Sequence, residues 1–133
     1  MKKIKIIVAE DDGVTQMFYE EGLSDDVFDK RIVENGQEAV SEYKSWNPDI
    51  VVLDMMMPLK NGKEALTEIR KMEKDCNRRT MVVMATAIST KEDIHECAKI
   101  GIEGYINKPF EVSEISDLIL KCYEKFQSSN STE

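Results

Sequence analysis

Apolar runs of strand length alternate with helical patterns along the whole chain, and this alternation restricts the fold more than any other feature. The segments 50–53 and 81–85 are apolar at every position, which is typical of strands covered on both faces. Between them, the stretch 65–72 has apolar residues at helical spacing. Strands that alternate with helices over short connections predict an α/β fold, a doubly wound parallel sheet with helices on both faces.

Five strand patterns can be located, each followed by a helical one. The strands are expected at 4–9, 31–33, 50–53, 81–85 and 103–107. The charged flanks of 31–33 indicate a strand near an edge of the sheet. The helices are marked by apolar residues at helical spacing, which are Val14, Met17 and Phe18; Ala39, Val40 and Tyr43; Ala65, Leu66, Ile69 and Met72; Ile94, Cys97 and Ala98, expected to face inward; and Val112, Ile115, Ile119, Cys122 and Phe126.

Several residues also signal where helices begin and end. Asn47-Pro48 should stop the second helix, and Ser89-Thr90-Lys91-Glu92 is typical of a capping box at the start of the fourth. Gln127 to Glu133 is polar and is expected to fray. We therefore expect one domain over residues 1–126 and a polar C-terminal tail over residues 127–133.

Composition limits the classes of function. The chain has 133 residues, 41% hydrophobic and 33% charged, which describes a soluble globular domain with its own core. A net charge of −8 argues against direct binding to nucleic acid. No apolar run approaches the length of a membrane span, and no signal peptide is present, so membrane insertion is not expected. Cys76, Cys97 and Cys122 are odd in number without a CxxC spacing, which favours a reducing cytoplasm.

Polar side chains follow four of the five expected strands. Glu10-Asp11-Asp12 follows the first strand, Asp54 the third, Thr86 the fourth and Lys108-Pro109 the fifth. Each has an ordinary structural explanation when taken singly, as a helix cap, a strand residue or a turn. The carboxyl ends of parallel strands share one edge of a sheet, where ligands bind in doubly wound folds. These side chains are therefore expected to meet.

Clustered carboxylates repel one another unless a cation or a shared proton offsets their charge. Glu10, Asp11 and Asp54 supply three negative charges, which a divalent ion and Lys108 would balance. Oxygen ligands without cysteine or neighbouring histidine favour a hard ion such as Mg²⁺. Lys108 and the Thr86 hydroxyl would then face a phosphoryl group, so the site is suited to placing that group on a carboxylate.

Four segments carry a family resemblance from about Lys3 to Phe126. The chain resembles the receiver domain of two-component response regulators in Ile-Ile-Val-Ala-Glu10-Asp11-Asp12, Val-Val-Leu-Asp54-Met-Met-Met-Pro58-Leu-Lys-Asn-Gly62, Val-Val-Met-Ala-Thr86-Ala87 and Gly-Tyr105-Ile-Asn-Lys108-Pro109-Phe110. The resemblance implies the flavodoxin-like (βα)5 fold with five parallel strands in the order 2-1-3-4-5.

The resemblance also implies roles for individual residues. Asp54 would be the phosphoacceptor, and Glu10, Asp11, Asp54 and the backbone carbonyl of Met56 would bind Mg²⁺, with Mn²⁺ as an alternative. Glu10 departs from the commoner aspartate but leaves metal binding intact. Lys108 would pair with the acyl phosphate, and the Lys108–Pro109 peptide bond would be cis.

Thr86 and Tyr105 match the family's switch pair. The resemblance implies that both move on phosphorylation and repack the face formed by the helix after Thr90, the strand ending at Asn107 and the last helix. A sensor histidine kinase or phosphotransfer protein would be the phosphodonor, and a downstream protein would bind that face. The domain would be no enzyme beyond its own phosphorylation and slow autodephosphorylation.

Three other classes of protein share part of this pattern. A small phosphohydrolase of the haloacid dehalogenase type also uses an aspartyl phosphate, but its nucleophile would fall on Glu10 and it usually has a cap domain. A flavodoxin needs Ser, Thr and Gly after the first strand, where this chain has carboxylates that would repel a phosphate. A degenerate receiver would lack key residues that are present here. Because the chain ends soon after the last helix, we expect a stand-alone regulator of the chemotaxis type or a phosphorelay intermediate.

Overall fold

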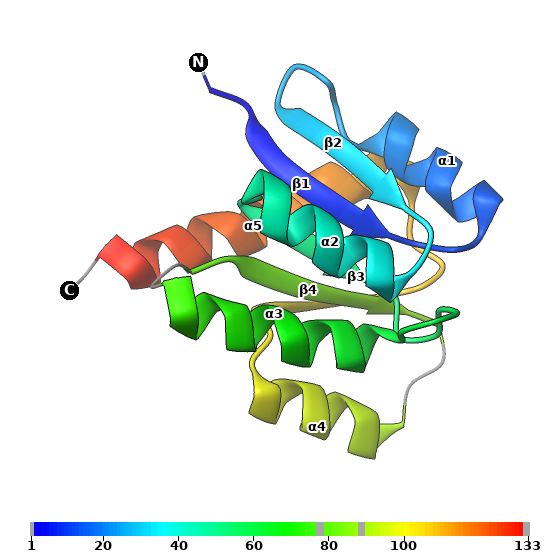
Figure 1. Ribbon diagram of the computed structural model, residues 1–133. Helices are drawn as coiled ribbons and strands as arrows, with labels where there is room; N and C mark the ends of the chain where they lie inside the picture. The colour runs from blue at the N-terminus through cyan, green and yellow to red at the C-terminus, as the bar shows by residue number, and fades with distance from the viewer. Residues whose placement is uncertain (1, 77–78, 88–89, 132–133) are drawn as a thin grey trace.

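The computed structural model of the chain, which describes residues 2–76, 79–87 and 90–131, is built on one parallel sheet in the order β2-β1-β3-β4-β5 (Figure 1). The strands are β1 (Ile4–Ala9), β2 (Phe28–Val33), β3 (Ile50–Leu53), β4 (Met81–Thr86) and β5 (Gly104–Asn107). The helices are α1 (Gly13–Gly22), α2 (Gly36–Trp46), α3 (Gly62–Cys76), α4 (Lys91–Ile100) and α5 (Val112–Ser131). This confirms the predicted flavodoxin-like fold and its strand order.

The sheet separates two apolar cores. Alternate residues of each central strand point to opposite faces, so that Ile6 and Val8 pack with α1 and α5, whereas Ile7 and Ala9 pack with α2 and α3. In Figure 1, α2 and α3 lie on one side of the sheet and α1 and α5 on the other. All residues of β3 and β4 are buried, which explains why the segments 50–53 and 81–85 are apolar at every position.

Two helices present different faces from those that spacing suggested. On α1, Val14 and Met17 are 58% and 61% exposed, and the buried residue is Tyr19. On α4, Cys97 is buried, whereas Ile94 and Ala98 are exposed, so the expectation that all three face inward was wrong. In Figure 1, α4 lies beyond α3 at the end of its layer, and Cys97 is the one residue of this helix that is buried.

Several boundaries also differ from the predicted ones. β2 begins at Phe28 rather than at residue 31. The ring of Phe28 is buried in the core, and the side chain of Lys30 binds the end of α1. The Lys30 ammonium donates to the carbonyls of Glu20 and Leu23 at 2.7 and 2.6 Å and so caps the end of α1. Charged residues in this strand therefore concealed it from the sequence pattern.

Three other ends shift by a few residues. β4 extends through Thr86, and β5 begins at Gly104 rather than at residue 103. Ser89 lies outside the described residues, and the N-cap of α4 is Thr90, whose hydroxyl accepts from the Asp93 amide at 3.0 Å. α5 continues to Ser131, so most of the expected frayed tail continues the helix.

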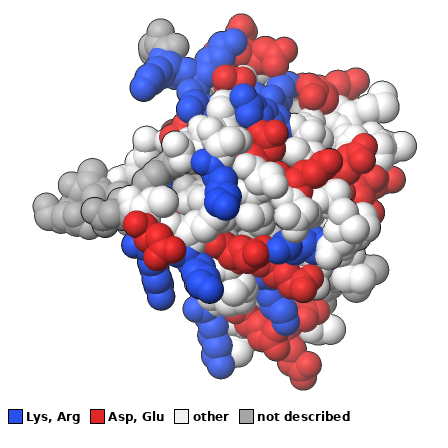
Figure 2. Space-filling model, viewed as in Figure 1, with Lys and Arg blue, Asp and Glu red and all other residues white. Residues whose placement is uncertain are grey.

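Charge is unevenly distributed over the surface. Figure 2 shows acidic side chains gathered on the side toward which β1 and β2 point in Figure 1. That side holds the carboxyl ends of the strands. Among the described residues, no helix is both long enough and apolar enough to cross a membrane.

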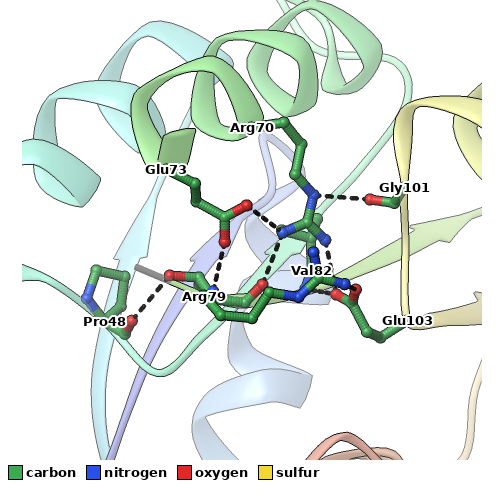
Figure 3. Close-up of polar contacts among 8 residues, drawn as sticks. Pro48, Arg70, Glu73, Arg79, Val82, Gly101 and Glu103 are labelled. Atoms are coloured by element: carbon green, nitrogen blue, oxygen red, sulfur yellow. Dashed lines mark hydrogen bonds and ion pairs between the residues drawn. The ribbon is translucent and has the colours of Figure 1, made fainter. Parts of the chain in front are cut away.

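A buried ion-pair cluster joins α3, β4 and the loop before β5 (Figure 3). The Arg70 guanidinium donates to the carboxylates of Glu73 and Glu103 at 2.8 and 2.7 Å, and to the carbonyls of Thr80 and Gly101 at 2.8 and 2.9 Å. Glu103 also accepts from the Val82 amide at 2.7 Å. Because these bonds join separate elements, the Arg70 side chain ties α3 to the segments that lead into β4 and β5, at the amino ends of these strands.

Candidate functional site

The carboxyl edge of the sheet brings together the acidic residues that follow β1 and β3. Glu10 and Asp54 are only 1% and 6% exposed, whereas Asp11 is exposed to solvent. One carboxylate oxygen from each of the three residues can be chosen so that all lie within 4.8 Å of one another. Residues 44 positions apart in the sequence thus form one cluster, because β1 and β3 are neighbours in the sheet.

Lys108 reaches the same cluster from the end of β5. Its ammonium donates to Glu10 Oε1 at 2.5 Å and to Asp54 Oδ2 at 2.7 Å. The peptide bond between Lys108 and Pro109 is cis. The Lys108 amide also donates to the carbonyl of Thr86 at 3.2 Å, which ties the loop after β5 to the end of β4.

The carboxylates and the ammonium change each other's proton affinity. Burial raises the pKa of Glu10, an effect that the hydrogen bond from Lys108 reduces and the nearby charge of Asp54 increases. Burial alone would lower the pKa of Lys108, but its hydrogen bonds to Asp54 and Glu10 outweigh burial and raise that pKa. The ammonium therefore stays charged at neutral pH, and one cation faces two buried carboxylates.

The oxygen donors suit a hard divalent cation. Each carboxylate oxygen has two lone pairs, and the observed hydrogen bonds use one on each: Glu10 Oε2 accepts from the Asp12 amide at 3.1 Å and Asp54 Oδ1 from the Met56 amide at 3.2 Å. Asp11 is exposed and close by, so it offers a ligand from the solvent side. Carboxylate and carbonyl oxygens are the ligands that Mg²⁺ prefers. The residues therefore fit Mg²⁺.

The remaining predicted residues surround this cluster at different depths. Thr86 is 2% exposed at the end of β4. Tyr105 is half-buried on β5, and its hydroxyl is buried without a hydrogen-bond partner among the described residues. Met56 lies two residues after Asp54 and is 62% exposed.

Two glycines position the loop that follows β3. The Gly62 amide donates to the carbonyl of Met55 at 3.0 Å, and a Cβ atom at Gly62 would overlap with the carbonyl oxygen of Asp54. The Gly36 amide similarly donates to the carbonyl of Lys60 at 3.0 Å, where a Cβ atom would also overlap. The backbone of Asp54 thus lies against α3 at a distance that only glycine permits.

Replacing Gly62 by alanine is expected to lower the free energy of unfolding by about 1–3 kcal/mol, because the added methyl group must displace the backbone of Asp54. Gly13→Ala is the matched control, since a Cβ atom there meets nothing within 4 Å and alanine favours the helix. Urea unfolding of both variants measures the difference. Equal effects of the two substitutions would contradict the close approach at Asp54.

Sequence reasoning missed some residues that shape the site. Gln16 Nε2 donates to the carbonyl of Glu10 at 2.6 Å, which fixes the loop after β1. Tyr19 is completely buried, and its hydroxyl has no hydrogen-bond partner among the described residues. Nothing in the local pattern marks either residue, because both act through contacts that exist only once α1 has packed. Gly62, which lies against the backbone of Asp54, could have been suspected from the sequence, since Asn61-Gly62 stands directly before a helical pattern.

Comparison with known proteins identifies relatives over most of the chain. A family model described as "Response regulator receiver domain" matches residues 6–120. The chain is 38% identical to chemotaxis protein CheY of Halobacterium salinarum over 86 residues, which cover 65% of this chain and 68% of that protein. It is 35% identical to the probable transcriptional regulator ycf27 of Porphyridium aerugineum over 133 residues, covering 98% of this chain but only 53% of that protein.

Solved structures show the same fold. A CheY-like response regulator receiver domain protein from Methanospirillum hungatei superposes with a TM-score of 0.85 at 16% identity, covering 96% of this chain and 99% of that one. A chain of the CheX–CheY–BeF3–Mg complex from Borrelia burgdorferi gives a TM-score of 0.79 at 24% identity, covering 90% of this chain and 89% of that one. The alternative of a haloacid-dehalogenase-type phosphohydrolase receives no support from these comparisons. The chain belongs to the family of response regulator receiver domains.

Proposed function

We propose that Asp54 accepts a phosphoryl group from a sensor histidine kinase or phosphotransfer protein in a Mg²⁺-dependent reaction. The observation that supports this most directly is the convergence of Lys108 on the carboxylates of Asp54 and Glu10, at 2.7 and 2.5 Å. An ammonium between two carboxylates supplies positive charge for a phosphoryl group, and one of these carboxylates can act as the nucleophile.

The residues divide the chemistry between them. An oxygen of Asp54 attacks phosphorus, so that a P–O bond forms while the P–N bond to the donor histidine breaks and the imidazole keeps the electron pair. The Lys108 ammonium, released from the free Asp54 carboxylate, pairs with a phosphoryl oxygen. The Thr86 hydroxyl donates to another.

Glu10, Asp11, Asp54 and the Met56 carbonyl would hold Mg²⁺, or Mn²⁺ as a substitute. The ion would neutralise negative charge on the phosphoryl oxygens. The same site would also support slow hydrolysis of the acyl phosphate, so the domain would catalyse its own phosphorylation and dephosphorylation and no other reaction. The phosphodonor and the three free cysteines suit a cytoplasmic protein.

The switch would run from Thr86 to Tyr105. If the Thr86 hydroxyl moves toward the phosphoryl group, Tyr105, whose hydroxyl has no partner among the described residues, can move into the space beside it. The α4-β5-α5 face would then change shape, and its two helices carry exposed apolar side chains, Ile94 on α4 at 37% and Leu118 on α5 at 40%. A downstream protein would bind there. Converting a mostly inactive population to a mostly active one requires about 5.5 kcal/mol of differential stabilisation.

Replacing Asp54 by asparagine is expected to abolish phosphoryl uptake from acetyl phosphate in the presence of Mg²⁺, because an amide oxygen is a poor nucleophile. Uptake is measured by intact mass, and the modified residue is mapped by peptide analysis after trapping. Asp29→Asn, which changes an exposed carboxylate on β2, is the control and should retain full uptake. Phosphorylation of Glu10 or Asp11 would contradict the proposal, since a phosphohydrolase nucleophile would lie in that loop.

A further inference from the structure

α4 is held unevenly along its length. Its first six residues, 91–96, are exposed apart from the partly buried Asp93, and Cys97 is the one buried residue of the helix. Just after its C-terminal end, the Gly101 carbonyl accepts from the Arg70 guanidinium at 2.9 Å within the buried ion-pair cluster (Figure 3). Burial and hydrogen bonding thus fix the C-terminal end of α4, whereas side-chain packing does little to hold its N-terminal half.

One ion pair joins that half to the neighbouring helix. The Lys63 ammonium on α3 donates to the carboxylate of Glu96 on α4. Among the described residues, no other hydrogen bond or ion pair links a side chain of residues 91–96 to another element. The two side chains are 36% and 51% exposed, so water screens the pair and it can break at low cost.

The position of Lys63 is unfavourable for α3 itself. It is the second residue of the helix, where the positive end of the helix dipole repels a cation. The preceding Gly62 is fixed, because its amide donates to the Met55 carbonyl at 3.0 Å and a Cβ atom there would overlap with the carbonyl oxygen of Asp54. Lys63 thus extends from a rigid part of the chain, and its partner Glu96 lies on a loosely held one.

We propose that the ion pair between Lys63 and Glu96 is a latch, which holds the N-terminal half of α4 against α3, and that α4 opens from this end while its end near Gly101 stays in place. Lys63 is a positioning residue in this arrangement, since it acts through α4. A helix of ten residues is not stable alone, so its first turns fray when they leave α3.

The latch has a consequence for the proposed switch. The α4-β5-α5 face is the one that phosphorylation is proposed to change, and α4 moves most readily at the end that the latch holds. Breaking the ion pair is then part of the free energy that phosphorylation must supply. This consequence rests on the proposed function, whereas the latch itself is a property of the unphosphorylated chain.

Amide hydrogen exchange of the full chain without metal, followed by nuclear magnetic resonance, tests the latch. In Lys63→Gln and in Glu96→Gln, the amides of residues 94–97 are expected to exchange about threefold faster, within the range for exposed ion pairs. The Gly101 amide, which donates to the Cys97 carbonyl at 2.9 Å, should keep its rate. Lys60→Gln is the matched control, because Lys60 pairs with Glu68 on α3 and not with α4, so the rates in α4 should not change.

Exchanging the two charges separates the pair from its single residues. The double variant Lys63→Glu with Glu96→Lys restores the attraction, so exchange in residues 94–97 should return to the wild-type rate or below it. The latch is overturned if neither single variant speeds exchange there, or if the double variant fails to restore it. Equal acceleration at Gly101 would overturn the fixed C-terminal end.

Binding of beryllofluoride with Mg²⁺, a mimic of the phosphoryl group, tests the consequence for the switch by isothermal titration calorimetry. The dissociation constant should fall about threefold in both Lys63→Gln and Glu96→Gln, although these variants change the local charge in opposite directions. An unchanged or opposite response would show that the latch does not oppose the switch. If the wild type does not bind beryllofluoride, the proposed function fails instead, and hydrogen exchange still decides whether the latch exists.

Discussion

Replacing Arg70 by methionine is expected to lower the free energy of unfolding by about 3–5 kcal/mol, because it leaves the buried Glu73 carboxylate without its cation and Glu103 with only the exposed Arg79. The side chains of Glu73 and Glu103 are 6% and 13% exposed, so water cannot take over from the guanidinium. The carbonyls of Thr80 and Gly101 would lose their donor as well (Figure 3). Urea unfolding monitored by circular dichroism measures the loss.

Arg79→Met is the matched control for this prediction. Arg79 also donates to Glu103, at 2.6 Å, but its side chain is 54% exposed, and exposed ion pairs contribute at most about 1 kcal/mol. Both variants remove a guanidinium from Glu103, but only the Arg70 variant takes away a buried one that also serves Glu73 and two backbone carbonyls. If both cost the same, the cluster around Arg70 does not hold the fold in the way that its hydrogen bonds indicate.

Mg²⁺ at a hundred times its dissociation constant is expected to stabilise the folded protein by about 2.7 kcal/mol. The physical reason is that Glu10, Asp11 and Asp54 come within 4.8 Å only in the folded chain, so the unfolded chain has no comparable site. The stabilisation appears as a rise in melting temperature with Mg²⁺ concentration in calorimetry or in thermal circular dichroism.

Asp11→Asn provides the sharpest test of that stabilisation. Asp11 is exposed, so its replacement should leave the metal-free fold unchanged while it reduces the effect of Mg²⁺. Asp29→Asn on β2 changes an exposed carboxylate away from the cluster and should retain the full effect. An equal rise in melting temperature for both variants, or none in the wild type at millimolar Mg²⁺, would show that the cluster is not a metal site.

The fold was predictable because local signals and global packing agree over most of the chain. The uniformly apolar strands β3 and β4 are buried on both faces, and the pattern over 50–53 and 81–85 requires that environment. The second helix ends at Trp46 as expected, since Asn47 takes a left-handed backbone conformation before Pro48. Such features depend on residues close in sequence.

Predictions were weakest where an element's surroundings decide its orientation. The spacing of Val14, Met17 and Phe18 is helical, but α1 approaches α5 at Gly22, where a Cβ atom would overlap with Ile115, and this contact turns Tyr19 to the core. The prediction for β2 was too short because a lysine at position 30 does not suggest a strand. In the structure the Lys30 ammonium is buried and caps α1. Hydrophobic period cannot reveal which side of a helix a neighbour will cover.

By itself the sequence determined the order of strands and helices, the residues that end each strand and the sign of the charge they bring to one edge. Only the tertiary structure decided that Lys108 bridges Glu10 and Asp54, that Arg70 joins α3 to the loop before β5, and that Tyr19 is buried in the core. The physical reason is the distance along the sequence over which each kind of interaction acts. Hydrophobic period and helix caps act over a few residues, whereas a hydrogen bond between residues 98 positions apart exists only after the sheet has set their separation.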